Sequence, residues 1–557
     1  LRATLDIVNG SGKLEVRYYW AQSLAGPLTE FGPVSTLAGT TATFVSTAPL
    51  QIAPTDLSVA VPRYPVAGKV YAAEVRSGIN GTVVAAPNFE AQPVGTAGFA
   101  DSAGRVWSYS GTAAIVDRQD LFTGEIKSWP QKWVPSGEAV WTPVEAVGVL
   151  HRYGQGQKAL DSTLRRRIPS GNPDAYWPFE EDSDASRAYS PIKGVAPAAV
   201  TGVEFAAVDT LPSSKALPQL TAAATLSAIV PASNTGTWQV EFVYNADDKA
   251  PAAAGPHAEV ISISTTGTVR RWVIGMRSGN VRIYGFDASG TDIIFRSITV
   301  AGDVFHGWVR LRLWARDTGG GSFDYFISFQ DVGGDAGGLG GTETGAAGRV
   351  TAVPANWGAL TDGWAFGHLS VLPTAASSLY TGSDNAYAGE TAWARMLRLA
   401  AEEGIPIGRV AGELTPERVG PQRPETLLTL LQAAADTDGG MLLEDRARLG
   451  LIYRDRSSLY TQEPALTLTY AVPGLAPPLE PVDDTTATRN DRSVTRDGGS
   501  SARAVLEEGA LSVQPPPLGI GLYDDAVTLS LNDDTQPEPI AYWSLHLGTY
   551  DGARYPS

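Results

Sequence analysis

The sequence has no cysteine, and only 5 of its 557 residues are histidine. Without cysteine the chain cannot form disulfide bonds, thiolate zinc sites or iron–sulfur clusters, and it has no cysteine nucleophile. The histidines are far apart and include no His-x-x-x-His pair: His151, His257, His306, His368 and His546. We interpret them as scattered polar or capping residues and predict no metal and no cofactor; a zinc site assembled by the fold is the alternative.

Basic residues and long apolar runs are also scarce. The chain has 42 Lys and Arg residues against 59 Asp and Glu, a net charge of -17. Broad binding to nucleic acid or to an anionic membrane surface requires positive charge, so we predict neither. The longest apolar stretch, residues 220–230, is rich in Ala, Ser and Thr and is shorter than the roughly 18 residues of a membrane span. No charged-then-apolar leader follows Leu1, and we expect no signal peptide.

Glycine (60 residues) and proline (38 residues) are plentiful, and short β-branched and aromatic runs recur between them. This pattern is typical of β-rich domains, and we predict a mainly β, multidomain protein. The run WVRLRLW, residues 308–314, alternates Val309, Leu311 and Leu313 with two tryptophans and two arginines. Such alternation predicts a strand with one core face and one solvent face, the latter carrying Trp308 and Trp314.

Two helices are expected in the last third of the chain. Residues 389–404 repeat apolar side chains at helical spacing and end at a glycine: Trp393, Met396, Leu397, Ala400 and Gly404. Residues 423–440 begin with Pro424 in the first turn, carry a leucine-rich face and end near Gly439. Residues 441–456 then predict two strands joined by a tight turn near Arg446, so that helix and hairpin form one α+β unit.

Three stretches are predicted to be connections or loops. Residues 164–173 form a basic connector with proline and glycine, and residues 473–490 are rich in Pro, Asp and Thr. Residues 331–348 contain so much glycine that we expect a long mobile loop there.

Enzyme motifs are hard to find. Residues 9–14, NGSGKL, differ from a phosphate-binding loop because the first glycine is misplaced and Leu14 stands where a hydroxyl would hold magnesium. We therefore predict a turn. No Gly-x-Ser-x-Gly elbow is present in the sequence.

The acidic run FEEDSDAS, residues 179–186, is the strongest candidate for catalysis. Glu180, Asp182 and Asp184 would share one face of a strand, and sugar-cleaving enzymes use paired carboxylates as acid and nucleophile. Because the run follows Pro178 and contains Ser183, we favour a solvated acidic turn. A calcium-binding or hydrogen-bonding role and catalysis are the alternatives. We predict no catalytic residue and a protein that is not an enzyme.

Residues 104–170 resemble the first hub domain of minor tail proteins (tail-tip or baseplate hub proteins) of actinobacterial, Streptomyces-type, long-tailed phages. The resemblance rests on F-x-GEI-x-x-WP-x-x-W at residues 122–133, PVEAVGVLHRYGQG at residues 143–156 and the Leu-Arg-Arg-Arg exit at residues 164–167. Residues 174–190, DAYWPFEEDSDASRAYS, are similar to the opening strand of laminin-G-like, concanavalin-type jelly rolls. Residues 490–504, NDRSVTRDGGSSARA, resemble the strand and Gly-Gly turn of a second hub barrel.

The resemblance implies four parts. They are an N-terminal β-rich segment at residues 1–60, a first hub β-barrel at 61–170, an inserted laminin-G-like jelly roll at 171–388 and a second, α+β hub domain at 389–557. Residues 541–557 resemble a helix-bearing continuation, and we expect the chain to run on past Ser557.

The resemblance also implies a function. We expect a structural virion protein of the phage tail tip: a homotrimeric hub, made in the bacterial cytoplasm, that closes the tail tube and carries the host-adsorption apparatus. Its partners would be distal tail, tube and tail-fibre proteins. The 14 Trp and 20 Tyr residues agree with large protein contacts.

Two alternatives concern the jelly roll. It could be a glycan-binding adhesin for a host surface sugar, in which exposed aromatic rings stack on sugar faces. The candidates are Trp272, Tyr284, Trp308 and Trp314, which would otherwise pack against the hub or neighbouring chains. The less favoured alternative is a polysaccharide-cleaving enzyme that uses Glu180, Asp182 or Asp184.

Overall fold

The computed structural model describes residues 2–7, 13–21, 28–30, 32–38, 50, 52, 70–109, 113–115, 122–130, 132–133, 140–299, 304–334, 336–460 and 486–550. The protein is mainly β, as predicted, with one large antiparallel sheet, several small sheets and few helices. Contacts divide it into two compact units, Leu1–Gly148 with Asp445–Gly450, and Val149–Glu444 with Leu451–Ser557. None of the helices in the described ranges combines the length and apolarity that crossing a membrane requires.

The first unit consists of small antiparallel sheets. Four strands form one sheet: β1 (Arg2–Asp6), β2 (Lys13–Trp20), β3 (Thr29–Glu30) and β4 (Ser35–Ala38). The others pair two by two, β5 with β6, β7 with β8, β9 with β12 and β10 with β11. Their bounds are β5 (Val75–Ser77), β6 (Thr82–Ala85), β7 (Gly98–Ala100), β8 (Val106–Ser108), β9 (Glu125–Ser128), β10 (Lys132–Trp133), β11 (Val140–Trp141) and β12 (Glu145–Val147). Among the described residues these strands do not close a barrel, and the first hub barrel stays a prediction.

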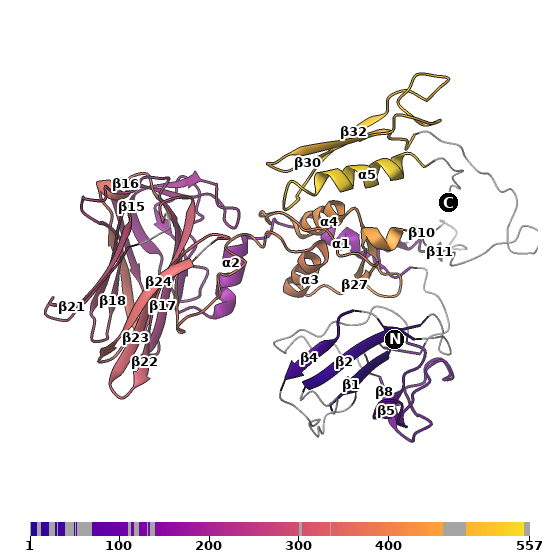
Figure 1. The fold of residues 1–557 in the computed structure, drawn as a ribbon, viewed down its shortest axis with the longest axis horizontal. Coiled ribbons are helices and arrows are strands. Elements are labelled where there is room, and N and C mark those ends of the chain that lie inside the picture. Colours follow the sequence, from indigo (N-terminus) through magenta and orange to yellow (C-terminus); the bar gives the residue numbers. More distant parts are fainter. Residues whose placement is uncertain are drawn as a thin grey trace, which may run out of the picture. The chain divides into compact units, whose positions relative to one another are not determined.

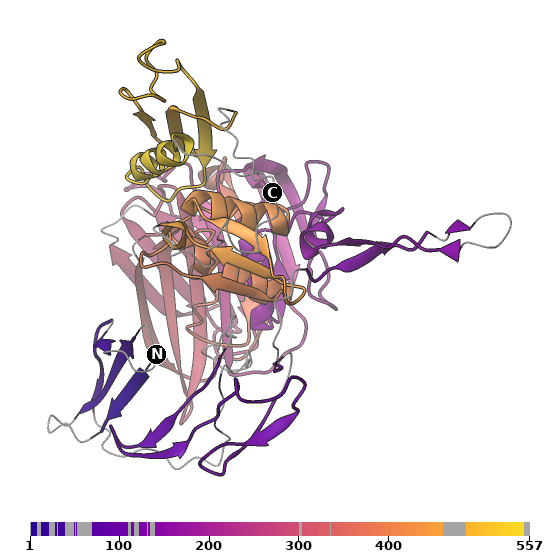
Figure 2. The same cartoon turned by 90° about the vertical axis from the view of Figure 1, so that its right-hand side faces the viewer.

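Strands β9 to β12 form one narrow two-stranded ribbon, drawn in purple in Figure 2. The F-x-GEI-x-x-WP motif lies on this ribbon, and its aromatic side chains are exposed: Phe122 by 54% and Trp129 by 63%. Exposed aromatic rings on a narrow ribbon suit contact with another protein surface.

The second unit contains a sandwich made from a 14-stranded antiparallel sheet that curls on itself. The strands follow one another across the sheet in the order β21-β20-β19-β18-β25-β16-β26-β17-β22-β23-β24, with β13, β14 and β15 beside this path. Figure 1 shows β17, β22, β23 and β24 in one layer and β18 and β21 in the facing layer. The outermost strands meet through an ion pair of 2.9 Å between Arg296 on β21 and Glu343 on β24. The bounds are β13 (Ala175–Trp177), β14 (Arg187–Ala188), β15 (Ala198–Val208), β16 (Leu217–Ile229), β17 (Thr237–Asn245), β18 (Ala258–Thr265), β19 (Arg271–Arg277), β20 (Asn280–Phe286), β21 (Asp292–Thr299), β22 (Trp308–Gly319), β23 (Ser322–Asp331), β24 (Ala336–Thr344), β25 (Val350–Asn356), the short 3-10 helix η2 (Ala359–Thr361) and β26 (Ala365–Leu372).

Alternation of apolar and polar residues builds the core between the two layers. On β22 the side chains of Val309, Leu311 and Leu313 are fully buried, which confirms the predicted core face. Trp238 on β17 and Trp272 on β19 meet edge to face in the middle, with ring centroids 6.0 Å apart. The two layers therefore share one interior, and each also has an outer face.

The outer face of β17 and β22 is covered by the chain itself, which differs from the solvent face predicted there. Trp308 is only 9% exposed and Arg310 only 5%. The segment that follows β26 lies on this face: the carbonyl oxygen of Ser377 accepts a 2.6 Å hydrogen bond from Arg312 on β22. The prediction failed because a strand's sequence does not show which distant segment covers it.

A buried ion cluster fastens this segment to the sheet. Arg310 places Nε 3.1 Å from Glu241 Oε1 and Nη1 2.8 Å from Asp384 Oδ2. Gln239 donates a 2.6 Å hydrogen bond to the other oxygen of Glu241. Burial raises the pKa of Glu241 to about 7 even though Arg310 and Arg312 act in the opposite direction. Asp384 is thereby held over β22, and the return path of the chain is fixed.

The glycine-rich stretch is not a mobile loop, as we expected from composition, because residues 336–344 form the edge strand β24 paired with β23. Aromatic rings of β23 occupy the space that side chains would need. A Cβ on Gly337 would lie 2.7 Å from the ring of Phe329, and one on Gly340 would lie 2.7 Å from the ring of Phe326 and closer still to the carbonyl oxygen of Tyr325. Glycine is therefore required for the close approach of strand and rings.

A small α/β domain carries the sandwich. Its core combines Val149 and Tyr153, which precede the sandwich in sequence, with residues from Ala392 to Tyr453, which follow it. The sandwich is thus inserted into this domain. The elements are α1 (Val149–Gly154), α3 (Ala392–Glu403), β27 (Ile407–Val410), α4 (Leu427–Asp438), β28 (Met441–Glu444), β29 (Leu451–Arg454) and the 3-10 helix η3 (Arg456–Leu459).

Both predicted helices and the hairpin are confirmed. The hydroxyls of Thr391 and Thr426 cap the first turns of α3 and α4, and Gly404 and Gly439 end them in the left-handed conformation. The second helix begins after Thr426 rather than at Pro424, because the threonine side chain supplies the cap. β28 and β29 pair antiparallel, as the hairpin prediction requires.

The predicted connector at residues 164–173 is instead mostly helical. It contains α2 (Thr163–Arg167) and the 3-10 helix η1 (Ile168–Gly171), and Leu164 and Ile168 are fully buried in the sandwich core. Three arginines separate Leu164 from Ile168, so the sequence pattern did not indicate an apolar helix face.

A third core lies near the C-terminus, where α5 (Pro537–Gly548) packs on the sheet of β30 (Asp491–Arg496), β31 (Ser501–Val505) and β32 (Asp524–Leu529). The strand and Gly-Gly turn predicted at residues 490–504 are confirmed by the β30–β31 pairing. Most of the predicted connection at 473–490 lies outside the described residues, as do residues 551–557. The four domain limits remain predictions.

We expect Gly340→Ala to destabilise the sandwich by about 1–3 kcal/mol, because the added methyl group clashes with the Phe326 ring and the Tyr325 carbonyl. Gly358→Ala is the matched control: nothing lies within 4 Å of its Cβ position, and its backbone is extended, so its effect should stay within about 0.5 kcal/mol. Urea unfolding measures both. Equal stability of the two variants would show that β24 does not pack as described.

We expect Glu241 to make the sandwich less stable as pH rises from about 4.5 to about 7. The unfolded chain releases this proton near its ordinary pKa of 4.5, whereas the folded protein keeps it until about pH 7. Stability is therefore lost with rising pH in this window, by at most about 3 kcal/mol. Glu241→Gln removes the titrating group.

The measurement is the difference in unfolding free energy between wild type and Glu241→Gln, at pH 5 and at pH 8. This difference should move in favour of the variant at pH 8. Asp182→Asn, which changes an exposed carboxylate, is the control and should give the same difference at both pH values. A Glu241→Gln difference that does not change with pH would contradict the assignment.

Candidate functional site

The strongest catalytic candidate, Glu180, is buried and belongs to a hydrogen-bonded cluster. Its Oε1 accepts hydrogen bonds from the hydroxyl of Ser162, from Ser214 Oγ at 3.0 Å and from the amide of Lys215 at 3.0 Å. Burial alone would raise the pKa of Glu180, but the nearby His368 and these donors lower it overall. The carboxylate is therefore satisfied inside the protein.

His368 joins the same cluster. Its Nε2 lies 2.7 Å from Ser214 Oγ, and its Nδ1 lies 2.8 Å from the hydroxyl of Tyr176. Burial lowers the pKa of His368 to about 4, so the ring is neutral at neutral pH. The hydroxyl and amide donors, rather than an ion pair with His368, hold the Glu180 carboxylate at that pH.

This serine, histidine and carboxylate cannot act on a polysaccharide. Glu180 is 7% exposed, Ser214 4% and His368 0%, so a sugar chain has no access to them. Asp182 and Asp184 lie exposed on a turn, and no strand forms there to align the three carboxylates. The solvated-turn interpretation is right for these two aspartates and wrong for Glu180, which has the hydrogen-bonding structural role. Across the described ranges no group of His, Asp and Glu side chains is placed to hold a metal ion.

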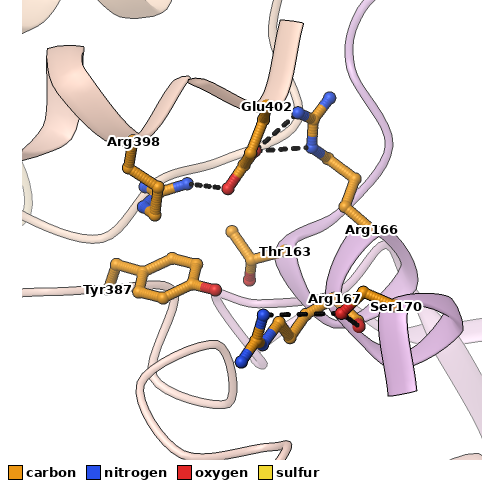
Figure 3. Close-up of a pocket in the computed structure, with 7 residues that line it drawn as sticks. All are labelled: Thr163, Arg166, Arg167, Ser170, Tyr387, Arg398 and Glu402. Atoms are coloured by element: carbon orange, nitrogen blue, oxygen red, sulfur yellow. Dashed lines mark hydrogen bonds and ion pairs between the residues drawn. The ribbon is translucent and has the colours of Figure 1, made fainter. Parts of the chain in front are cut away.

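A groove of about 290 Å³ lies where α2 meets α3. Figure 3 shows its lining side chains, three of which are arginines: Thr163, Arg166, Arg167, Ser170, Tyr387, Arg398 and Glu402. Arg166 lies 2.6 Å from Glu402 and 2.7 Å from Glu403, and the Arg398 guanidinium lies 3.8 Å above the ring of Tyr387. Arg398 also pairs with Glu390 and Glu402, whereas Arg167 donates a 3.4 Å hydrogen bond to Ser170. The ion pairs of Arg166 and Arg398 join the sandwich to the α/β domain, and we give this groove a structural role.

Two of the four predicted sugar-stacking residues are inside the sandwich. Trp272 is 1% exposed and packs against Trp238. Trp308 is 9% exposed, and its Nε1 donates a 3.0 Å hydrogen bond to Thr210. Their ring faces are unavailable to a ligand, and the prediction of a sugar platform is wrong for both.

Trp314 is half-buried on the outer face of β22. It stacks on Phe326 of β23, with ring centroids 6.1 Å apart and an angle of 23° between the planes. The guanidinium of Arg316 lies 5.7 Å from the Trp314 ring and 3.5 Å from Asp324. This small aromatic pair carries a neutralised arginine.

Tyr284 belongs to a larger surface, which we call the β20 face. Alternate residues of β20 point outward and are half-buried: Asn280, Arg282, Tyr284 and Phe286. Tyr284 lies between Val273 of β19 and Phe295 of the edge strand β21 in the register of the sheet. Five residues of this face are the candidate site: Arg271, Arg282, Tyr284, Phe286 and Phe295.

The rings of the β20 face are close enough to form one platform. Tyr284 and Phe286 are nearly parallel, with centroids 6.2 Å apart, and Tyr284 and Phe295 are 5.3 Å apart. Phe295 is 48% exposed. The guanidinium groups of Arg271 and Arg282 lie 4.7 Å from the Phe286 ring and 5.7 Å from the Phe295 ring. Aromatic rings bordered by cations can stack on a flat partner and bind its charged groups.

Sequence reasoning found Tyr284 but missed Arg271, Arg282, Phe286 and Phe295. The period-2 pattern of β20 contained enough information to place Arg282 and Phe286 beside Tyr284. Arg271 and Phe295 come from neighbouring strands, and only the register of the sheet brings them to the same face.

No protein-family model matches the chain, and no curated protein matches its sequence. Several solved structures resemble part of it. The receptor binding domain of botulinum neurotoxin D is 10% identical over 39% of this chain and 51% of that chain, with a TM-score of 0.26. Domain 4 of AbnA, an extracellular arabinanase from Geobacillus stearothermophilus solved with arabinotriose, is 13% identical over 38% of this chain and 98% of that chain, with a TM-score of 0.25.

The CBM2 module of the evolved Dit of Lactobacillus casei BL23 phage J-1 is 10% identical over 31% of this chain and 78% of that chain, with a TM-score of 0.22. The chain spans about half the length of the toxin binding domains that it matches. Because every TM-score is far below 0.5, these likenesses are distant, and we base no functional argument on what those proteins bind.

Proposed function

We propose that this chain is a structural protein of a phage tail tip, a trimeric hub in the virion that closes the tail tube and displays a host-binding domain. The observation that carries the proposal is the insertion of the sandwich into the α/β domain, whose core is completed by residues from both sides of the insertion. This is the architecture that the sequence resemblance implies. An inserted domain joins its scaffold by two connections, which suits its display from that scaffold.

Two further observations support the proposal. The ribbon of β9 to β12 carries the hub-like sequence motif and exposes Phe122 and Trp129, which suits contact with a neighbouring subunit or tail protein. Glu180, the best catalytic candidate, is enclosed and satisfied by hydrogen bonds. We therefore propose binding and assembly rather than catalysis.

A second candidate function, adhesion to a host surface glycan, is favoured by the β20 face. Three aromatic rings lie side by side there, and Phe295 exposes almost half of its surface. Aromatic rings are the side chains that stack on the apolar faces of sugars. The two functions are compatible, since the hub would carry the adhesin.

For assembly, we expect native mass spectrometry of the purified chain, at two concentrations, to show a trimer. Trp129→Ala should weaken trimer formation by roughly tenfold, because exposed aromatic residues at interfaces contribute most of the binding energy. Trp314→Ala, in the sandwich, is the matched control and should leave the trimer unchanged. A monomer at both concentrations, also in the presence of isolated tail tubes, would contradict the hub.

For adhesion, we expect Phe295→Ala to slow adsorption of the assembled particle to host cells by roughly fivefold, because it removes an exposed stacking ring. Trp314→Ala, which removes a ring from the other outer face of the sandwich, is the matched control and should leave adsorption unchanged. Trp308→Ala should instead lower the melting temperature of the sandwich, since this ring is buried. Unchanged adsorption of a folded Phe295→Ala particle would exclude the β20 face as the adsorption site.

A further inference from the structure

We propose that the β20 face binds a carboxylated polysaccharide, a polymer of acidic pyranose sugars. The inference rests on the proposed adhesive role of the sandwich and adds the chemical class of the ligand. It follows from three features of the face: its shape, its uncompensated positive charge and the alternation of ring and cation along it.

The face is a strip on the outer surface of the sheet. The face spans the strands β19, β20 and β21, and β21 is an edge of the curled sheet. Outward residues of β20 extend from Asn280 to Phe286, a length of about 20 Å at the rise of a strand. A strip of this length suits an extended polymer, whereas small molecules are usually bound in enclosed pockets.

The charge of the face is opposite to that of the chain. Residues 270–299 contain five arginines and two acids, Asp287 and Asp292, in a protein whose net charge is -17. Arg270 precedes β19, Arg277 donates to a backbone carbonyl and Arg296 pairs with Glu343, which leaves two arginines on the face. Within the described part of the chain, Arg271 and Arg282 have no carboxylate partner, and their polar contact is a 3.3 Å hydrogen bond from Arg282 to the Tyr284 hydroxyl.

The acids do not neutralise this pair. Asp287 is engaged in its own turn, where its Oδ1 accepts hydrogen bonds from Ser289 and Thr291. Asp292 and Arg271 flank Phe286 on opposite sides in the register of the sheet, and within the described residues no ion pair joins them. A carboxylate from outside the chain would give Arg271 and Arg282 the bidentate partner that guanidinium groups prefer.

Ring and cation alternate along the face, which selects among anionic polymers. Each guanidinium lies 4.7–5.7 Å from an aromatic ring centroid. A sugar that stacks on Tyr284 or Phe295 thereby holds a carboxylate on its ring near Arg282. A polymer of phosphate groups without sugar rings would use the arginines and leave the aromatic platform empty.

The aromatic pair at Trp314 provides an internal comparison. Its arginine, Arg316, already lies 3.5 Å from Asp324. The same kind of cation beside the same kind of ring is therefore neutralised on one face and left uncompensated on the other. This contrast assigns the anionic ligand to the β20 face.

The test measures binding of the full chain to three polymers by biolayer interferometry at constant ionic strength. They are polygalacturonate, its fully methyl-esterified form and inorganic polyphosphate. The esterified polymer keeps the sugar backbone without the charge, and polyphosphate keeps the charge without the rings. We expect polygalacturonate to bind at least roughly tenfold more tightly than either, and its binding to weaken as salt is added.

Two variants locate the site. Arg271→Gln combined with Arg282→Gln should weaken polygalacturonate binding by roughly tenfold or more, because two charge-assisted hydrogen-bonding groups are lost. Phe295→Ala should weaken it by roughly fivefold through the loss of stacking. Arg316→Gln removes one arginine beside the other aromatic pair and should leave binding within about twofold of wild type. A thermal unfolding measurement on each variant checks that it is folded.

The outcomes separate this inference from the proposed function. Equal binding of the charged and esterified polymers would overturn the acidic class while leaving a glycan adhesin intact. Preference for polyphosphate would assign the arginines to a phosphate polymer and overturn the carboxylate. If neither sugar polymer binds and a panel of neutral glycans also fails, the adhesive role fails with it. The trimer measurement tests the tail-tip hub independently of all three.

Discussion

The burial of Arg310 between Glu241 and Asp384 is the constraint on which the placement of the sandwich depends. An unpaired charge at this depth would cost several kcal/mol, so Asp384 must remain over β22, together with the segment that contains it. The entry of the chain is tied to the same segment, because the buried hydroxyl of Thr163 donates a 2.7 Å hydrogen bond to the carbonyl of Ser383. Entry and exit are therefore fastened together, and the α/β domain carries the sandwich by two anchored ends.

Because of this anchoring, the sandwich has one outer face that the chain itself covers and one that it does not cover. The outer face of β17 and β22 holds arginines and aromatic residues, as the β20 face does. On the first, Glu241 and Asp384 neutralise Arg310, and the covering segment excludes a ligand. On the second, no carboxylate of the described ranges meets Arg271 or Arg282. Arginines and aromatic residues thus stabilise the fold on one face and are available for recognition on the other. The difference between the two faces is whether a carboxylate of the chain pairs with the arginines.

Local sequence signals were sufficient for α3, α4 and the β28–β29 hairpin, and insufficient for α2, β24 and the surfaces. Caps and stops such as Thr391 and Gly404 act within one turn, so the α3 prediction needed no tertiary information. Trp308 and Trp314 have the same parity on one strand, yet the first is buried and the second is half-buried, because covering segments reach only part of β22. Glu180 is satisfied by Ser162 and Ser214, and β24 is a strand because of the rings on β23. In each of these cases, contacts with residues that are distant in sequence determine the burial or the conformation of the segment.

The geometry of a sandwich places the anchoring segment and the proposed binding surface on opposite sides of the domain. Two packed layers share one interior, so their outer faces point in opposite directions. Because the return segment lies on the β17 and β22 face, the β20 face is directed away from that segment. An isolated positive strip on an acidic protein also orients an anionic polymer before contact, since the rest of the surface repels it. The ion cluster that anchors the chain on one side therefore leaves the recognition face exposed on the other.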